Sequence, residues 1–145
     1  MRYAMCICLA AALGYLMIHQ QDSVGLFMLD RKVRRFLPAK CKRSHLMNVL
    51  GTLAGIRPYG PTRLGESIHE VADRVPKRGL MVLLSDLLAD REAVIQALHH
   101  LSYRGHDLIV FQVLDHSEVA FEFDGQVRFE DPETHEQVTA DPRGI

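Results

Sequence analysis

Three short apolar runs, each bounded by polar or turn-forming residues, constrain the fold of this chain more than any other feature. They cover residues 24–29, 80–84 and 108–114. Strands that are apolar on both faces are typical of a parallel sheet that helices cover on both sides. Segments with helical spacing of apolar residues lie between the runs. The sequence therefore predicts an α/β fold with parallel crossovers, in which all three strands are buried.

Capping and turn residues predict the order of the elements. The order is helix, two strands, helix, helix, strand, helix, strand and a final hairpin. Ser44 and Asp90 are suitable N-caps for two of the helices, and another helix begins near Arg63. Residues 126–130 and 136–139 flank a turn-forming segment, which predicts the C-terminal hairpin.

Composition limits the class of protein. A chain of 145 residues with 48% hydrophobic content indicates a single globular domain over residues 1–145. Residues 1–43 carry eight lysines and arginines against two acids, whereas residues 115–141 carry nine acids against one arginine, so the charge is polarised. Three cysteines without a Cys-x-x-Cys pair predict neither a disulfide framework nor a zinc ribbon, and favour a reducing cytoplasm.

The first residues allow two interpretations. Residues 4–18 are mostly apolar after Arg2, which gives them the charge and length of a signal peptide. They are shorter than the ~20 apolar residues of a membrane span. The run continues into residues 19–22 without a polar cleavage region and then into a strand, so a buried core helix is favoured.

The candidate chemistry lies where the strand at residues 80–84 ends. Open α/β sheets bind ligands at the carboxyl ends of their strands. Asp86 follows this strand, and together with Ser85 and the loop hydroxyl of Thr62 it offers oxygen ligands of the kind that Mg²⁺ and Mn²⁺ prefer. The alternative is that Asp86 and Thr62 are helix N-caps. The spacing leaves both alternatives open.

A basic run follows the first apolar strand. It could mark nucleic-acid or anionic-membrane binding, but its place on and after a predicted edge strand favours a solvated edge that resists pairing. Phe36 is the only aromatic residue within it, so no nucleic acid is expected as a partner. The first four of these residues are candidates for contact with a partner protein. The run consists of Arg31, Lys32, Arg34, Arg35, Lys40, Lys42 and Arg43.

Enzymatic motifs are not found. His99 and His100 are adjacent in a predicted helix and point in different directions, and there is no His-x-x-x-His or Gly-x-Ser-x-Gly. We therefore expect a protein that is not an enzyme. The alternative is a receiver-like phosphoryl-transfer signalling domain that uses Asp86. That alternative requires an acidic pair after an earlier strand and a lysine after a later one, and the sequence has neither.

Six segments of the chain resemble the bacterial DUF58 family, and the likeness runs from Tyr3 to Arg143. The segments are residues 22–26, 33–38, 60–64, 84–86, 104–107 and 123–131. The resemblance implies a fold similar to a von Willebrand factor A domain, with a mostly parallel sheet flanked by helices. It also implies a metal-ion-dependent adhesion site, in which Thr62 matches the family threonine and Asp86 the family aspartate.

The resemblance also shows what the sequence lacks. No Asp-x-Ser-x-Ser motif occurs, and the first central strand that would precede it is missing. We therefore expect an N-terminally truncated domain with an open sheet edge that invites self-association. Mg²⁺ or Mn²⁺ belongs to a complete family member, and we expect no tightly bound metal here. The implied partner is a MoxR-type AAA+ ATPase, and the implied setting is cytoplasmic, with any membrane association made through partners.

Overall fold

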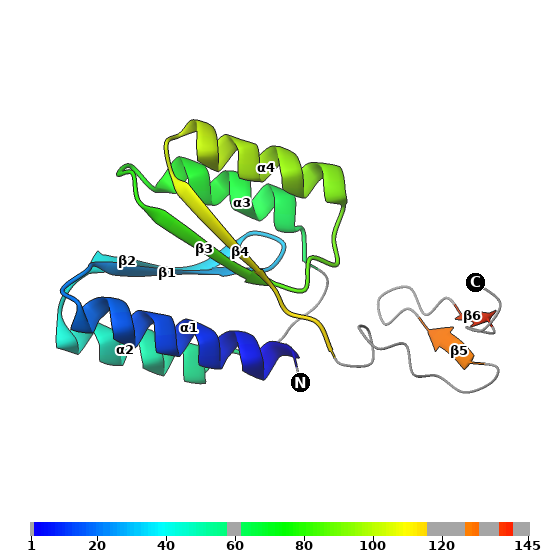
Figure 1. Ribbon diagram of the computed structural model, residues 1–145, viewed down its shortest axis with the longest axis horizontal. Helices are drawn as coiled ribbons and strands as arrows, with labels where there is room; N and C mark the ends of the chain where they lie inside the picture. Colours follow the sequence, from blue (N-terminus) through cyan, green and yellow to red (C-terminus); the bar gives the residue numbers. More distant parts are fainter. Residues whose placement is uncertain (1, 58–61, 116–126, 131–136, 141–145) are drawn as a thin grey trace. The chain divides into compact units, whose positions relative to one another are not determined.

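The computed structural model describes residues 2–57, 62–115, 127–130 and 137–140 (Figure 1). The chain divides into two compact units, Met1–Val113 and Leu114–Ile145. The single domain over residues 1–145 stays a prediction. The first unit contains all four described helices and four of the described strands, and the second contains one hairpin.

The described elements follow the predicted order. They are α1 Arg2–His19, β1 Val24–Leu29, β2 Val33–Lys40, α2 Arg43–Ala54, α3 Leu64–Arg74, β3 Leu80–Ser85, α4 Arg91–Tyr103, β4 Asp107–Gln112, β5 Val127–Glu130 and β6 Gln137–Ala140.

Two of the expected N-caps differ in the structure. Asp90 caps α4 as predicted, and its side chain accepts a hydrogen bond from the Ala93 amide at 2.7 Å. The N-cap of α2 is Lys42 and not Ser44, and no side chain caps this helix. The N-cap of α3 is Arg63, again without a side-chain bond. Where no oxygen side chain reaches the first amides, these helices depend on packing for their stability.

The strands form three separate pairs. β1 pairs with β2 in antiparallel fashion, β3 pairs with β4 in parallel, and β5 pairs with β6 in antiparallel fashion. The last pair confirms the predicted hairpin, whose turn lies outside the described residues. The mixed α/β class is confirmed. A single, mostly parallel sheet is not seen among the described strands, because no ladder joins β1 to β3.

The helices of the first unit form two layers. Figure 1 shows α1 and α2 on one side of β1 to β4, and α3 and α4 on the other. β2 is tied to α3 by the Val33 amide, which donates to Glu70 Oε2 at 2.8 Å. A carboxylate thereby satisfies a strand amide that lies against the core.

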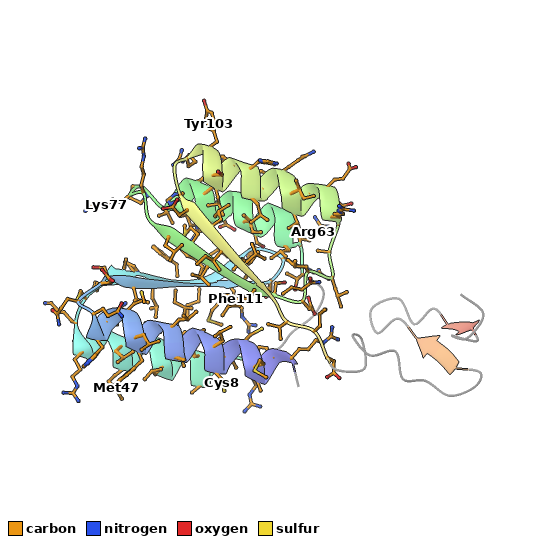
Figure 2. The ribbon with its side chains drawn as sticks, viewed as in Figure 1. Cys8, Met47, Arg63, Lys77, Tyr103 and Phe111 are labelled. Carbon is orange, nitrogen blue, oxygen red and sulfur yellow. The ribbon has the colours of Figure 1, made fainter. Side chains whose placement is uncertain are left out.

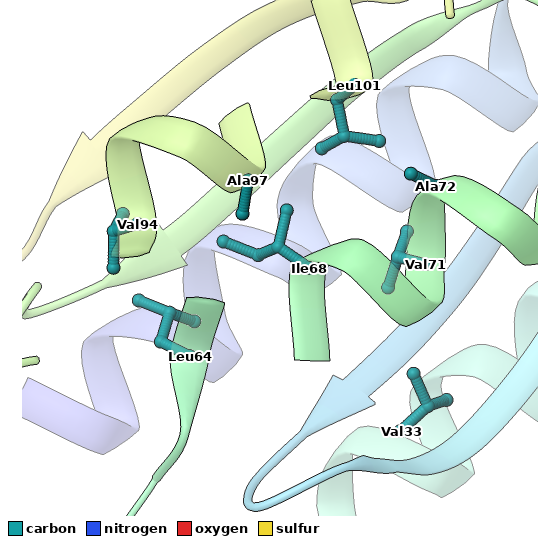
Figure 3. Packing of buried hydrophobic residues seen from close by; sticks show 8 residues of the cluster. All are labelled: Val33, Leu64, Ile68, Val71, Ala72, Val94, Ala97 and Leu101. Carbon is teal, nitrogen blue, oxygen red and sulfur yellow. The ribbon is translucent and has the colours of Figure 1, made fainter. Parts of the chain in front are cut away.

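The core lies under α3 and α4 (Figure 3). Ala72 and Ala97 are fully buried, which lets the two helices approach closely. Met81, Leu83 and Leu108, on one face of the parallel pair, pack against this cluster. The other buried members of the cluster are Val33, Leu64, Ile68, Val71, Val94 and Leu101.

The prediction that the apolar strands are buried on both faces is wrong for β3 and β4. Val82 lies opposite Ile109 in the ladder, and Leu84 opposite Phe111. Side chains alternate between the faces of a strand, so these four share the face opposite Met81 and Leu83. Val82, Ile109 and Phe111 remain 38–43% exposed, and Figure 2 labels Phe111. The described elements pack closely against the face toward α3 and α4 and cover the other face only in part.

The first helix forms as predicted but is only partly buried. Gly14 and Ile18 are its buried residues, whereas Met5, Tyr15 and Leu16 are exposed. Its 18 residues have a mean hydropathy of 1.4, so by length and composition α1 could cross a membrane. Signal sequences and core helices of soluble proteins have the same property.

Candidate functional site

Asp86 lies immediately after β3, where Ser85 is paired with Gln112 of β4. Local hydrogen bonds fix the loop that follows. Ser85 Oγ accepts from the Leu87 amide at 3.0 Å, and Asp86 Oδ1 accepts from the Leu88 amide at 3.2 Å. Leu87 has a positive φ of 59°, a conformation that costs energy for a residue with a side chain. The loop thus holds the Asp86 carboxylate in one orientation.

The second oxygen of Asp86 has a cationic partner. Arg2 Nη1 lies 3.4 Å from Asp86 Oδ2, and the two side chains are 34% and 38% exposed. Arg2 belongs to the first turn of α1, so this pair joins the start of the chain to the end of β3. A pair with this exposure contributes about 0–1 kcal/mol to stability.

Asp86 is not the cap of the following helix. Asp90 has that role in α4, and the Asp86 bond to Leu88 belongs to a turn that ends before the helix begins. The carboxylate of Asp86 therefore has no capping role.

Thr62 is exposed and does not cap α3. The approach to α3 is fixed instead by the backbone carbonyl of Asp30. This carbonyl accepts from the Arg63 amide at 3.2 Å and from Ser67 Oγ at 2.9 Å. Neither Asp86 nor Thr62 is therefore a helix N-cap.

The oxygen donors do not fit a tight Mg²⁺ site. Ser85 Oγ and both carboxylate oxygens of Asp86 already have protein partners. No group of three or more His, Cys, Asp or Glu side chains that could hold a metal occurs within the described residues. Mg²⁺ dehydrates reluctantly and requires octahedral oxygen ligands, so Asp86 and Thr62 alone offer too little to displace its water.

Asp86 also affects a thiol. Burial raises the pKa of Cys6, the Asp86 carboxylate raises it further, and a backbone hydrogen bond lowers it. A raised pKa keeps the thiol protonated and weakly nucleophilic at neutral pH. The three cysteines are free, and Cys8 is exposed.

The four basic residues that are candidates for contact with a partner protein lie in two places. Arg31 and Lys32 are exposed in the turn between β1 and β2, and Arg34 and Arg35 are on β2. Arg34 Nη1 lies 3.9 Å from Asp30 Oδ2. Arg35 forms no ion pair within the described residues and lines a hollow against α2.

Sequence reasoning missed a histidine pair between α3 and α4. His69 Nδ1 lies 2.9 Å from His100 Nδ1. One nitrogen donates and the other accepts, so the bond cannot persist when both rings are protonated. Helical spacing places each histidine on its own helix face, but only the packing of the two helices brings them together.

The comparisons with known proteins give one match. A family model described as "Protein of unknown function DUF58" matches residues 1–143. No curated protein matches the chain, and no solved structure matches it.

Proposed function

The chain belongs to the DUF58 family over residues 1–143, and we propose that it is a non-enzymatic protein-interaction module. The observation that carries this proposal is the place of Asp86 at the carboxyl end of β3, next to β4. Ligands of open α/β sheets bind at such ends. The Asp86 carboxylate is 38% exposed and already holds a cation, the Arg2 guanidinium. A basic group of a partner can compete for the same carboxylate.

We infer a von Willebrand factor A-like fold for the complete domain. Two features support it, namely the helices on both sides of the strands (Figure 1) and the parallel pairing of β3 with β4. A further strand between β1 and β3 would join the two pairs into one sheet. Such a strand would also pair the backbone groups that each of these strands leaves without a ladder partner.

The proposed partner is a MoxR-type AAA+ ATPase, as the family resemblance implies. In a complete family member Mg²⁺ or Mn²⁺ would supply an open coordination position for a carboxylate of the partner. Here Asp86 binds directly, with its carboxylate oriented by the Leu88 amide. We place the module in the cytoplasm, where its three free cysteines would stay reduced.

The test is capture of a MoxR-type ATPase by the chain and by two matched variants. Asp86→Asn keeps the shape of the side chain and removes its charge, and we expect binding to weaken by about tenfold or more. Asp73→Asn makes the same change on the exposed side of α3 and should have no effect. EDTA should not change binding. Equal capture by both variants, or no capture by the unchanged chain, would contradict the proposal.

A receiver-like phosphoryl-transfer domain is the second candidate, favoured by the strand-end position of Asp86 alone. In that case the carboxylate would attack the phosphorus of a small phosphodonor such as acetyl phosphate, break its bond to the acetate oxygen and form an acyl phosphate with release of acetate. Mass spectrometry after incubation with acetyl phosphate separates the two functions. We expect no adduct, and a stable phosphate on Asp86 would replace the first proposal by the second.

A further inference from the structure

A hollowed surface lies between β2 and α2. One hollow of about 430 Å³ is lined by Arg35 and Leu37 of the strand and by Met47, Asn48, Gly51 and Thr52 of the helix. A second, of about 280 Å³, shares Arg35, Gly51 and Thr52, and its other lining residues are Met28, Arg34, Gly55, Ile56 and Arg57. We call the two together the α2–β2 groove. It runs from Met47, labelled in Figure 2, to the end of the helix.

The alternation of β2 explains why a charged and an apolar side chain line the groove together. Arg35 and Leu37 are two residues apart and share the face toward α2. Phe36 lies on the opposite face, where its ring stacks on Phe27 with the centroids 4.3 Å apart. On the helix side, a Cβ added to Gly51 would meet nothing within 4 Å. The missing side chain at Gly51 leaves the groove open.

The groove is cationic and has few counter-charges. α1, β1, β2 and α2 contain no aspartate or glutamate. Arg34 has one acidic neighbour, Asp30, at 3.9 Å. Arg35 and Arg57 form no ion pair in the part of the chain that the structure describes. The end of α2 carries partial negative charge, which is smaller than the full charges of the three arginines.

Tyr3 of α1 lies within the electrostatic field of two of these arginines. Its hydroxyl oxygen is buried and has no hydrogen-bond partner within the described residues. Burial raises the pKa of Tyr3, whereas the charges of Arg34 and Arg57 lower it. The positive field of Arg34 and Arg57 therefore extends to the Tyr3 hydroxyl, which lines neither hollow.

We propose that the α2–β2 groove binds an acidic segment of a partner protein, independently of Asp86 and of any metal. Charge complementarity requires carboxylates opposite Arg35 and Arg57. The apolar lining of Leu37, Met47 and Ile56 suits the side chains that alternate with those carboxylates in an extended peptide. A single-stranded nucleic acid would require an aromatic stacking surface. The one aromatic ring of β2, Phe36, is used on the other face.

The experiment is a fluorescence-anisotropy titration with a labelled peptide of alternating glutamate and leucine. The same peptide with glutamine in place of glutamate is the ligand control. We expect Arg35→Glu and Arg57→Glu each to weaken binding by about tenfold or more, and added salt to weaken it further. Lys77→Glu makes the same charge change in an exposed loop after α3 (Figure 2) and should leave binding within about twofold.

Two further variants keep the test decisive. Gly51→Met fills the groove without a change of charge and should weaken binding, whereas Asp86→Asn should leave it unchanged. If Asp86→Asn loses binding, the peptide binds at the Asp86 site, and the proposal that it binds in the α2–β2 groove is wrong. If the glutamine peptide binds as tightly as the glutamate peptide, the proposal that the partner segment is acidic is wrong. If a single-stranded oligonucleotide binds more tightly than the peptide, the proposal that the partner is a protein is wrong. Circular dichroism of each variant confirms that it is folded.

Discussion

The two sides of the parallel β3–β4 pair differ in how well they are covered. On one side, α3 and α4 bury a continuous cluster in which Ala72 and Ala97 have no exposed surface. On the other side, Val82 and Ile109 are 39% and 43% exposed although they are as apolar as the residues of the core. Helices that follow their strands closely in sequence pack well, whereas the opposite face depends on α1 and on strands that do not pair with β3. The comparison separates local from long-range contributions to the fold.

The largest expected difference is in the free energy of unfolding that is lost when an isoleucine on each side is replaced by alanine. Ile68 is 2% exposed and Ile109 is 43% exposed. Ile68→Ala should lower the free energy of unfolding by about 2–5 kcal/mol, because it removes buried methyl groups and leaves a cavity. Ile109→Ala should cost less than about 1 kcal/mol. Urea denaturation of the two variants measures both values. Equal losses would show that the strand face is buried in solution.

Two glycines test the packing density of the helices. A Cβ on Gly65 would meet the carbonyl and Cβ of Ala93 at 3.0 Å, whereas one on Gly51 would meet nothing within 4 Å. Gly65→Ala should destabilise by about 1 kcal/mol, since overpacking outweighs the gain in helix propensity. Gly51→Ala should stabilise by about 0.5–1 kcal/mol. Thermal melts compare the two, and a stabilising Gly65→Ala would mean that α3 and α4 are less closely packed.

The open face should also cause self-association. Exposed apolar strands with unpaired edges associate with other copies, so we expect light scattering to report species larger than a monomer. Ile109→Lys should lower the average mass. Ile95→Lys, on α4, is the matched control because Ile95 is 42% exposed on a helix and should have little effect. A monodisperse monomer of the unchanged chain would contradict this prediction.

Local signals in the sequence predicted the elements well. Apolar periodicity gave the order of all described helices and strands, and the Asp90 cap is confirmed because a cap depends only on its own helix. Ser44 was predicted as a cap with the same reasoning, and a cap was one of the two alternatives for Thr62. Neither residue is a cap, since Lys42 and Arg63 occupy those positions. A shift of one or two residues at a helix start is enough to change the cap.

Contacts between elements were not predictable in the same way. The sequence identified Arg34 and Arg35 as part of a basic edge. The groove also requires Gly51, which is in α2, and Arg57, which follows α2. Strand alternation explains why Arg35 and Leu37 share a face once β2 is known, whereas the opposite wall depends on the packing of α2. The Arg2–Asp86 pair likewise joins residues 84 positions apart, and no local pattern indicates it.

The smallest expected effect is that of Mg²⁺ at the carboxyl end of β3. Titration calorimetry should detect no tight binding, because Asp86 Oδ2 faces Arg2 and Asp86 Oδ1 accepts from Leu88. Removing the guanidinium with Arg2→Ala frees one oxygen, but a single carboxylate and the Thr62 hydroxyl still cannot replace the waters of this ion. The midpoint of thermal unfolding should therefore be the same with Mg²⁺ and with EDTA for both proteins. Stoichiometric binding that is lost in Thr62→Ala and in Asp86→Asn would show instead that the two residues form a metal site, and that the Arg2 pair gives way to it.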